Sequence, residues 1–511
     1  MDMDHRPRTR LLSLVTIGTL FLGTSACGGG GGSGSAGRQS GDLVVAVATE
    51  PSTLDPQLVN DRSSRIVTDN LFETLLVRDE TSQIQPKLAD KYERVDDTTW
   101  RFTLHPGVTF HDGSPFDADA VVFSIERIID PDFDTQRTSY TEGIEGARKV
   151  DPRTVDILTD GKNPVLPAEM TSIPMVSPAS AGQQSFGHEV IVGTGPYKFG
   201  TWQRGREISL VRNDAYWGEK ASIAAFTVRV VPDAQTALSA LQAGEVDLVF
   251  DLFPEQAKLA PQVKEIRASD FSYVAFNTHR KELSDPRVRQ AMNLAVDKES
   301  LAETIYQGHA TPNQAQHLAK GMLGFNASLS PFPYDPEQAK RLLAEAGYPN
   351  GFDIELHVPI GRYSKGEETA DFVAAALGAV GVRAKVVKHD WNDYRELGRV
   401  KGTESGAFDL KYGWNSNEWF DAARIKSHIT CKGASSKFCD PKVDELVKAG
   451  ADTLDQAERQ RDYADMWARL HENPYSIYLL QQNYIFGASQ RLEWNPRPDD
   501  SYFVSTMRLT S

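Results

Sequence analysis

The residue patterns that usually signal catalysis are incomplete in this sequence. The stretch GTGPYKFG, beginning at Gly193, has Lys198 where the dinucleotide-binding pattern G-x-G-x-x-G needs its third glycine. No G-x-S-x-G or H-E-x-x-H pattern occurs. His105 and His111 bracket HPGVTFH and could form a metal pair, but the Pro-Gly between them is more typical of a turn. The sequence therefore predicts no catalytic residue, no metal and no cofactor, and hence a protein that is not an enzyme.

Residues suited to ligand binding gather instead in DLKYGWNSNEWFDAARI, from 409 to 425. Trp414 and Trp419 can stack on a flat ligand, and Asn415 can hydrogen-bond to it. Asp421 can hold a cationic group. Core packing is the alternative for both tryptophans, because tryptophan is usually buried.

Two other stretches carry candidate binding residues. PIGRYSKGEE lies between the expected strand FDIELHV and a helix starting near Glu367. The Arg362 guanidinium offers a planar fork for a ligand carboxylate, and Tyr363 follows it. Glu50 comes directly after a buried strand and can meet a cationic group, with a solvated loop carboxylate as the alternative.

These residues must be positioned by alternating helices and strands. Asp233, Asp285 and Asp335 each precede an amphipathic segment, so each is expected to cap a helix. A fourth helix is expected through Tyr463 and Leu470, ending at Asn473-Pro474. Strands are expected at LVVAV, EVDLVF and YSIYLL, at Thr99–Leu104, and from Phe110. This alternation predicts a mixed α/β architecture.

The composition limits the class of protein. At 511 residues the chain exceeds one ordinary core, so two or three domains are expected. Seventy acidic and 55 basic residues give a net charge of -15, which argues against nucleic-acid binding. A soluble globular protein fits these values.

The first 41 residues read as an export and tethering segment. Arg6, Arg8 and Arg10 precede the apolar stretch from 11 to 22, which is too short to span a bilayer but has the length of a signal-peptide core. Small residues and then Cys27 follow, which resembles the lipobox of bacterial lipoproteins and implies a lipidated Cys27 on the cell membrane. The alternative is an ordinary secretory signal. Residues 28–41 are nearly all Gly and Ser and predict a flexible tether.

The other two cysteines favour a disulfide. Cys431 and Cys439 form an even pair in a chain that is expected to be exported. A metal or redox pair would need C-x-x-C spacing or a histidine cluster, and neither is present.

One long stretch identifies a family. LADKYERVDDTTWRFTLHPGVTFHDGSPFDADAVVFSIERI, residues 88–128, resembles the signature of family 5 solute-binding proteins of ABC importers, the dipeptide- and oligopeptide-binding type. TEPSTLDP, VGTGPYKF, LVRNDAYWG, LQAGEVDLV and DPRVRQAMNLAVDKE resemble the family in the same order.

The resemblance implies two α/β lobes closing over a ligand, with an extra domain inserted in the first. The expected boundaries are a signal peptide at 1–26, a tether at 27–41, lobe I at 42–87, 191–284 and 485–511, the inserted domain at 88–190, and lobe II at 285–484.

The resemblance also implies function. It predicts an extracytoplasmic monomer that captures a short peptide and delivers it to an ABC permease and ATPase. In the peptide binders an aspartate soon after a Gly-Trp pair captures the α-amino group, whereas here Gly413-Trp414 is followed by Glu418 and only then Asp421. A glutathione-like peptide, opine, oligosaccharide or nickel chelate is the alternative cargo. An environmental sensor stays open as an alternative role.

Overall fold

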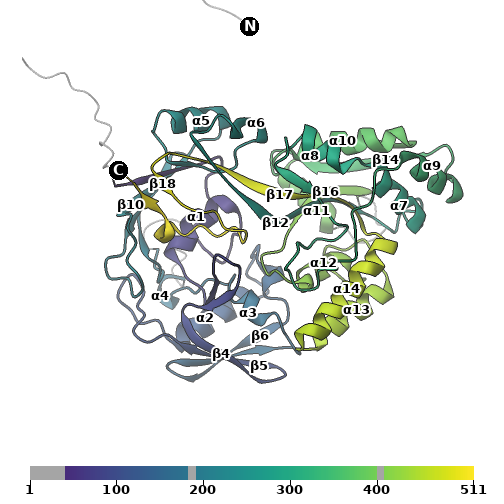
Figure 1. Cartoon of the computed structure of the whole chain (residues 1–511). Coiled ribbons are helices and arrows are strands. Elements are labelled where there is room, and N and C mark those ends of the chain that lie inside the picture. Colours follow the sequence, from purple (N-terminus) through teal and green to yellow (C-terminus); the bar gives the residue numbers. More distant parts are fainter. Residues whose placement is uncertain (1–40, 182–190, 400–407, 511) are drawn as a thin grey trace, which may run out of the picture. The chain divides into compact units, whose positions relative to one another are not determined.

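The computed structural model describes residues 41–181, 191–399 and 408–510. In these residues the main feature is an eleven-stranded mixed sheet with the order β15-β14-β16-β12-β17-β11-β1-β10-β9-β8, and β13 also pairs with β17. Three groups of elements surround separate apolar cores along and below this sheet, and we call them lobe I, the four-stranded domain and lobe II (Figure 1).

Lobe I packs around a core that includes Leu43, Phe226 and Tyr502. Its elements are β1 (Leu43–Val47), α1 (Arg62–Leu71), β8 (Tyr197–Gln203), β9 (Glu207–Arg212), β10 (Ala225–Val230), α5 (Ala234–Gln242), β11 (Leu248–Val249), α6 (Pro254–Ala257), β18 (Leu492–Glu493), η3 (Val504–Thr506) and β19 (Arg508–Leu509). Residues from both ends of the described chain therefore share one core, as the resemblance implied.

The four-stranded domain packs α2 against the sheet β4-β5-β7-β6, around Phe102, Val121 and Ile157. Its elements are β2 (Leu76–Arg78), β3 (Ile84–Pro86), β4 (Ala89–Asp96), β5 (Thr99–Leu104), α2 (Ala118–Ile129), η1 (Thr138–Tyr140), β6 (Ile144–Asp151), β7 (Thr154–Thr159), α3 (Leu166–Glu169) and α4 (Pro178–Ala181).

Lobe II has one core around Leu356 and Tyr412 and a second beneath the α13–α14 pair, around Tyr463 and Trp467. Its elements are α7 (Pro286–Ala295), α8 (Lys298–Thr304), β13 (Ala310–Pro312), α9 (Pro336–Glu345), β14 (Phe352–Pro359), α10 (Gly366–Ala379), β15 (Val382–His389), α11 (Trp391–Arg399), β16 (Leu410–Ser416), η2 (Ala422–Ile425), α12 (Lys426–Ile429), α13 (Pro441–Asp452) and α14 (Gln456–Glu472).

Two long strands belong to both lobes. β12 (Gln262–Phe276) and β17 (Ser476–Ala488) pair antiparallel along most of their length, and Figure 1 shows them running side by side between the two lobes. Phe486 of β17 lies in the lobe I core, whereas Ile477 lies in the lobe II core. The β12–β17 register shifts between Arg267 and Tyr273, which marks the crossing point between the lobes. The predicted two-lobe α/β fold is confirmed, while the exact domain boundaries stay predictions.

The predicted helix caps are present. Asp233, Asp285 and Asp335 each accept a hydrogen bond from a backbone N–H in the first turn of α5, α7 and α9. An aspartate at this position satisfies an N–H group that has no partner inside the helix. Asn473 ends α14, as expected from the Asn-Pro pair.

Several expected strands differ in length. EVDLVF forms only the two-residue β11, whereas YSIYLL begins the 13-residue β17. Phe110 begins no strand: the segment there closes with a single bridge between Thr109 and Pro115. Gly113, with φ 88°, forms the turn of this short segment.

The glycines of GTGPYKFG serve close packing. A Cβ atom at Gly193 would lie 1.9 Å from the carbonyl oxygen of Leu71, and one at Gly195 would lie 2.5 Å from that of Asn70. Only glycine permits this approach to the end of α1.

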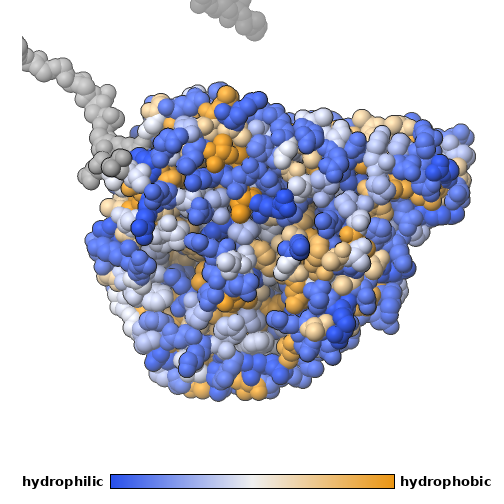
Figure 2. Space-filling model, in the orientation of Figure 1, coloured by the Kyte–Doolittle hydropathy of each residue, from blue (hydrophilic) through white to orange (hydrophobic). Residues whose placement is uncertain are grey.

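The Cys431–Cys439 disulfide is formed. The predicted signal peptide, Cys27 and nearly all of the tether lie outside the described residues. Among the described residues, no helix has the length and apolar character needed to cross a membrane. On the face in Figure 2, hydrophilic residues dominate and hydrophobic residues are scattered in small groups.

Candidate ligand-binding site

A cavity that is partly open to solvent lies where both lobes and the four-stranded domain meet, and the empty space there, open solvent included, is about 750 Å³. We call it the interlobe cavity. Its charged lining is balanced in sign. Arg65, Lys87, Arg78 and Arg137 are its basic residues. Asp69, Glu73, Glu418 and Asp499 are its acidic residues.

Helix α1 supplies one wall of the interlobe cavity. Asp61 caps the helix, and Ile66, Val67 and Leu71 bury its opposite face. Arg65 and Asp69, one turn apart, lie 3.3 Å from each other, and Arg65 is 3.7 Å from Asp500. The spacing i, i+4 places both charges on one face of the helix.

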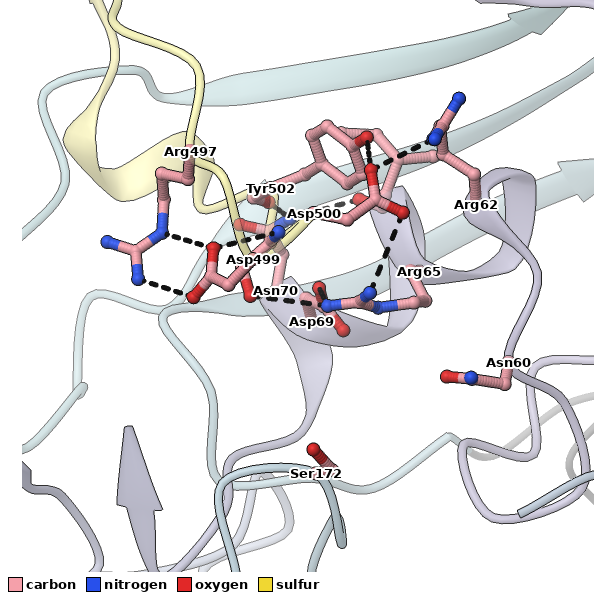
Figure 3. Close-up of polar contacts among 12 residues, drawn as sticks. Asn60, Arg62, Arg65, Asp69, Asn70, Ser172, Arg497, Asp499, Asp500 and Tyr502 are labelled. Carbon is pink, nitrogen blue, oxygen red and sulfur yellow. Dashed lines mark hydrogen bonds and ion pairs between the residues drawn. The ribbon is translucent and has the colours of Figure 1, made fainter. Parts of the chain in front are cut away.

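The C-terminal segment completes the ionic network beside α1. Arg62 Nε donates to Asp500 at 2.9 Å, and Arg497 pairs with Asp499 at 2.8 Å (Figure 3). Asn60 and Ser172 lie across from this network and also line the cavity. The charged groups of this wall therefore arrive already paired.

Glu73 is also fully engaged. Lys87 Nζ lies 3.1 Å from it, Tyr216 OH donates to Oε1 at 2.6 Å, and Trp217 Nε1 donates to Oε2 at 3.0 Å.

Glu418 differs from these acids. Its Oε1 accepts from Arg424 Nε at 3.1 Å, but its buried Oε2 has no hydrogen-bond partner among the residues that the structure describes. Burial is the largest influence and raises the pKa of Glu418, but the Arg424 guanidinium and hydrogen bonds from Tyr140 and the backbone together outweigh it and hold this pKa below its usual value. An ionised carboxylate with one unsatisfied oxygen can accept a hydrogen bond from a cationic ligand group.

A second cavity, of about 1120 Å³, lies within lobe II, and we call it the lobe II pocket. Its aromatic walls include Tyr273, Tyr394, Phe408, Phe438 and Tyr475. Its charged lining is Arg395, Arg399, Lys411 and Lys437, with His428. Burial, together with Arg424 and Lys411, lowers the pKa of His428 to about 4, so this ring is neutral at pH 7.

Two of the sequence-predicted residues line the lobe II pocket. The rings of Tyr363 and Trp414 stack with centroids 5.2 Å apart, and Trp414 Nε1 donates to Tyr412 OH at 2.8 Å. Arg362 is exposed beside them, with its guanidinium 4.9 Å from the Trp391 ring centroid.

The other predicted residues make internal contacts. Asn415 is buried in β16 opposite Phe271. Trp419 packs edge-on against Tyr140. Glu50, on lobe I, accepts hydrogen bonds from Trp202 Nε1 at 2.7 Å and Gly205 N at 2.9 Å.

Asp421 holds the loop after Trp419. It caps η2 by accepting from Ala423 N at 2.9 Å, and its two oxygens pair with Arg459 at 2.9 and 2.8 Å. Asp421 and Glu418, the two carboxylates that follow Gly413-Trp414, therefore differ: only Glu418 lines the interlobe cavity.

Sequence reasoning missed most of the cavity charges. Two sequence signals could have indicated these charges. One is the i, i+4 spacing of Arg65 and Asp69 on α1, and the other is Lys411, two residues before Gly413. Among the described residues, no group of three or more His, Cys, Asp or Glu side chains could hold a metal.

Lys365 of lobe II contacts lobe I directly. Lys365, at the start of α10, lies 2.8 Å from Glu255 of α6 and 5.1 Å from the centroid of the Phe253 ring. The lobes thus meet through both an ion pair and a cation–π contact.

Comparison with known proteins places this architecture in a family. Residues 83–434 match the model of bacterial extracellular solute-binding proteins, family 5 Middle. The chain is 31% identical to the glutathione-binding protein GsiB of Pectobacterium atrosepticum over 88% of this chain and 90% of that protein. It is 29% identical to heme-binding protein A of Haemophilus influenzae, over 84% and 85% of the two chains.

Solved structures agree. The binding protein AgaA from A. tumefacien R10, in complex with agropinic acid, is 26% identical with a TM-score of 0.81, over 92% of this chain and 99% of that one. The Helicobacter pylori protein DppA, in complex with the peptide STSA, is 24% identical with a TM-score of 0.78, over 92% and 98% of the two chains, and shares the fold. These relatives are binding proteins of ABC transporters rather than enzymes. The chain belongs to family 5 of the bacterial extracellular solute-binding proteins, the substrate-binding components of ABC importers.

Proposed function

We propose that this protein is a lipid-anchored receptor that binds a short peptide in the interlobe cavity and delivers it to an ABC permease. In this proposal Glu418 accepts the peptide's α-amino group. The observation that carries the proposal is the unsatisfied, buried Oε2 of Glu418 in the cavity wall.

The position of Glu418 in the sequence supports the assignment. In the peptide-binding members an aspartate soon after a Gly-Trp pair captures the amino group, and Glu418 is the first carboxylate after Gly413-Trp414. Asp421 follows three residues later, but Arg459 and the η2 backbone already engage its oxygens.

The balance of charge in the interlobe cavity supports a ligand with charges of both signs. Four basic and four acidic side chains line it. A zwitterionic peptide presents an ammonium and a carboxylate, and each can exchange a protein–protein ion pair for a protein–ligand one. Closing the lobes would then remove these groups from water.

A glutathione-like peptide or an opine is the second candidate cargo. The relative GsiB is named a glutathione-binding protein, and AgaA was solved with agropinic acid. Both cargoes would use the same cavity and the same anchor.

Calorimetric titration of tri-alanine tests the assignment of Glu418. Glu418→Gln should weaken binding by about tenfold or more, since a hydrogen bond to a charged group is lost. The exposed Glu303→Gln is the control and should bind as the wild type does. N-acetyl-tri-alanine should bind weakly to both proteins, with no further loss in Glu418→Gln. Equal affinity of acetylated and free peptide for the wild type would contradict the assignment.

The anchor is tested separately. We expect Cys27→Ala to move the protein from the membrane to the soluble fraction, measured by detergent phase partition. A variant that stays with the membrane would contradict lipidation at Cys27.

A further inference from the structure

The lobe II pocket has an uneven charge. Arg395, Arg399, Lys411 and Lys437 line it, and no aspartate or glutamate does so among the residues described. Lys437 is only 6% exposed. On a chain with net charge -15, a cavity whose described lining is basic and not acidic is a local feature that the bulk composition does not explain.

Lys411 is the central group of this pocket. Its Nζ lies 4.3 Å from the centroid of the Tyr394 ring and 5.8 Å from that of Phe408. A Cβ at Gly398 would lie 2.8 Å from this Nζ, so glycine there leaves space for the ammonium. In the described part of the chain no carboxylate forms an ion pair with Lys411, and none is among the groups that shift its pKa.

Burial and the neighbouring Lys437 lower the pKa of Lys411 to about 8. The Tyr394 and Phe408 rings only partly offset the cost of burying this ammonium. An anion brought into the pocket would offset both the desolvation and the repulsion.

Lys298 shows how this chain stabilises a lysine that is structural. Lys298 is 4% exposed and donates to the carbonyl oxygens of Asn293 at 2.6 Å and Val296 at 3.1 Å. Lys411 has aromatic faces around it in place of such acceptors. The contrast leaves the Lys411 ammonium without a carbonyl or carboxylate acceptor among the described residues, so an anion from outside could take that place.

The lobe II pocket and the interlobe cavity are lined by neighbouring parts of one chain segment. β16 supplies Lys411, Gly413 and Trp414 to the pocket, and the loop after β16 supplies Glu418 to the interlobe cavity. One continuous segment thus serves both cavities.

We infer that the lobe II pocket is a specificity subsite for an acidic ligand, which places a carboxylate on Lys411 between aromatic walls. The inference rests on the proposed function for the presence of a ligand, and it adds the ligand's chemical class. A peptide with an acidic side chain and an N-carboxyalkyl amino acid of the opine type both carry this chemistry.

The test is calorimetry with three matched pairs of alanine-based tripeptides, carrying Glu or Gln at the first, second or third position, and with N-(1-carboxyethyl)glutamate. In at least one pair the Glu peptide should bind about tenfold tighter than the Gln peptide, as a charge-assisted hydrogen bond provides. Lys411→Met should remove this difference. Lys432→Met, at an exposed lysine, should preserve it.

The outcomes separate the two proposals. If every peptide pair binds with affinities within about twofold, the acidic subsite is wrong while peptide binding stands. A preference for Glu that persists in Lys411→Met would also overturn the subsite. Binding of the carboxyethyl compound alone, lost in Lys411→Met, would support the subsite and overturn the peptide assignment. Binding of none of these probes would overturn both.

Discussion

The interlobe cavity and the lobe II pocket differ in how their charges are held. In the interlobe cavity Arg65, Glu73 and Asp499 arrive in ion pairs, and Arg137 donates to backbone carbonyl oxygens. In the lobe II pocket Lys411 faces rings and another ammonium. Paired charges stabilise the folded protein, whereas an unpaired one costs free energy that a ligand can recover. In our proposals the first cavity holds the ends of a zwitterion, and the second selects the sign of a side group.

The largest expected effect is on stability, from a charge in the interlobe cavity. Arg137 is buried and donates to the carbonyl oxygens of Pro56 at 2.9 Å, Val59 at 3.0 Å and Ser172 at 2.7 Å. Arg137→Met leaves these acceptors without their partner, so we expect a loss of about 3–5 kcal/mol in the free energy of unfolding. Urea denaturation followed by tryptophan fluorescence measures it. A loss below about 1 kcal/mol would show that these bonds are not structural.

Removing the disulfide should have a smaller effect on the free energy of unfolding. It also tests the comparison of the two cavities, because Lys437 of the lobe II pocket lies between the two cysteines in the sequence. The double variant Cys431→Ser, Cys439→Ser should lose about 2–3 kcal/mol of stability, since the unfolded chain gains loop entropy. Its preference for Glu over Gln peptides should fall while tri-alanine affinity is retained. If the variant lost its affinity for tri-alanine as well as its preference for Glu peptides, the lobe II pocket would not act separately from the interlobe cavity.

The pH dependence of binding should be a more modest effect, confined to the lobe II pocket. With a pKa of about 8, Lys411 is mostly protonated at pH 7 and mostly neutral at pH 9. The preference for a Glu peptide over its Gln counterpart should therefore fall by up to about tenfold across this range. The peptide α-amino group titrates equally in both peptides and cancels.

The groups that face Lys411 are consistent with this assignment. His357 of β14 lies opposite Lys411 of β16 in the sheet. Burial lowers the pKa of His428 and of His357, so both rings are neutral from pH 7 to 9. Burial raises the pKa of Tyr394 well above 10, so it stays neutral. Arg395, Arg399 and Lys437 are the other basic side chains of the pocket. An unchanged pH dependence in Lys411→Met would assign the titration to another group.

The smallest effect should be that of Lys411→Met on stability. Because no internal ion pair of Lys411 is lost among the described residues, we expect no loss in the free energy of unfolding, or a small gain. The same urea titration as for Arg137→Met gives a direct comparison. A loss as large as that of Arg137→Met would remove the distinction between the two cavities.

Local signals made much of the fold predictable. Aspartate caps at 233, 285 and 335 act within one helical turn, so the sequence pattern alone indicates them. Strand lengths were less accessible, because β17 extends to 13 residues only by pairing with β12, β11 and β13, far away in the sequence.

The site was predictable only in part, for a similar reason. The pattern around Gly413-Trp414 marks a segment that lines a cavity, and Tyr363 and Trp414 meet in the lobe II pocket, while their role in ligand binding stays a prediction. The sequence could not distinguish Glu418 from Asp421, because the partner that engages Asp421 is Arg459, 38 residues away. Lys411 was missed because a lone lysine in a strand is usually exposed, and only the approach of Tyr394 and Phe408 encloses it.

Native mass spectrometry of the protein purified without the proposed lipid anchor tests the central claim most directly, because it weighs the ligand that the protein selects from its own surroundings. The account predicts bound masses of short peptides that contain an acidic residue, and their loss in Glu418→Gln. A glycan, a metal chelate or a set of basic peptides in the cavity would contradict it.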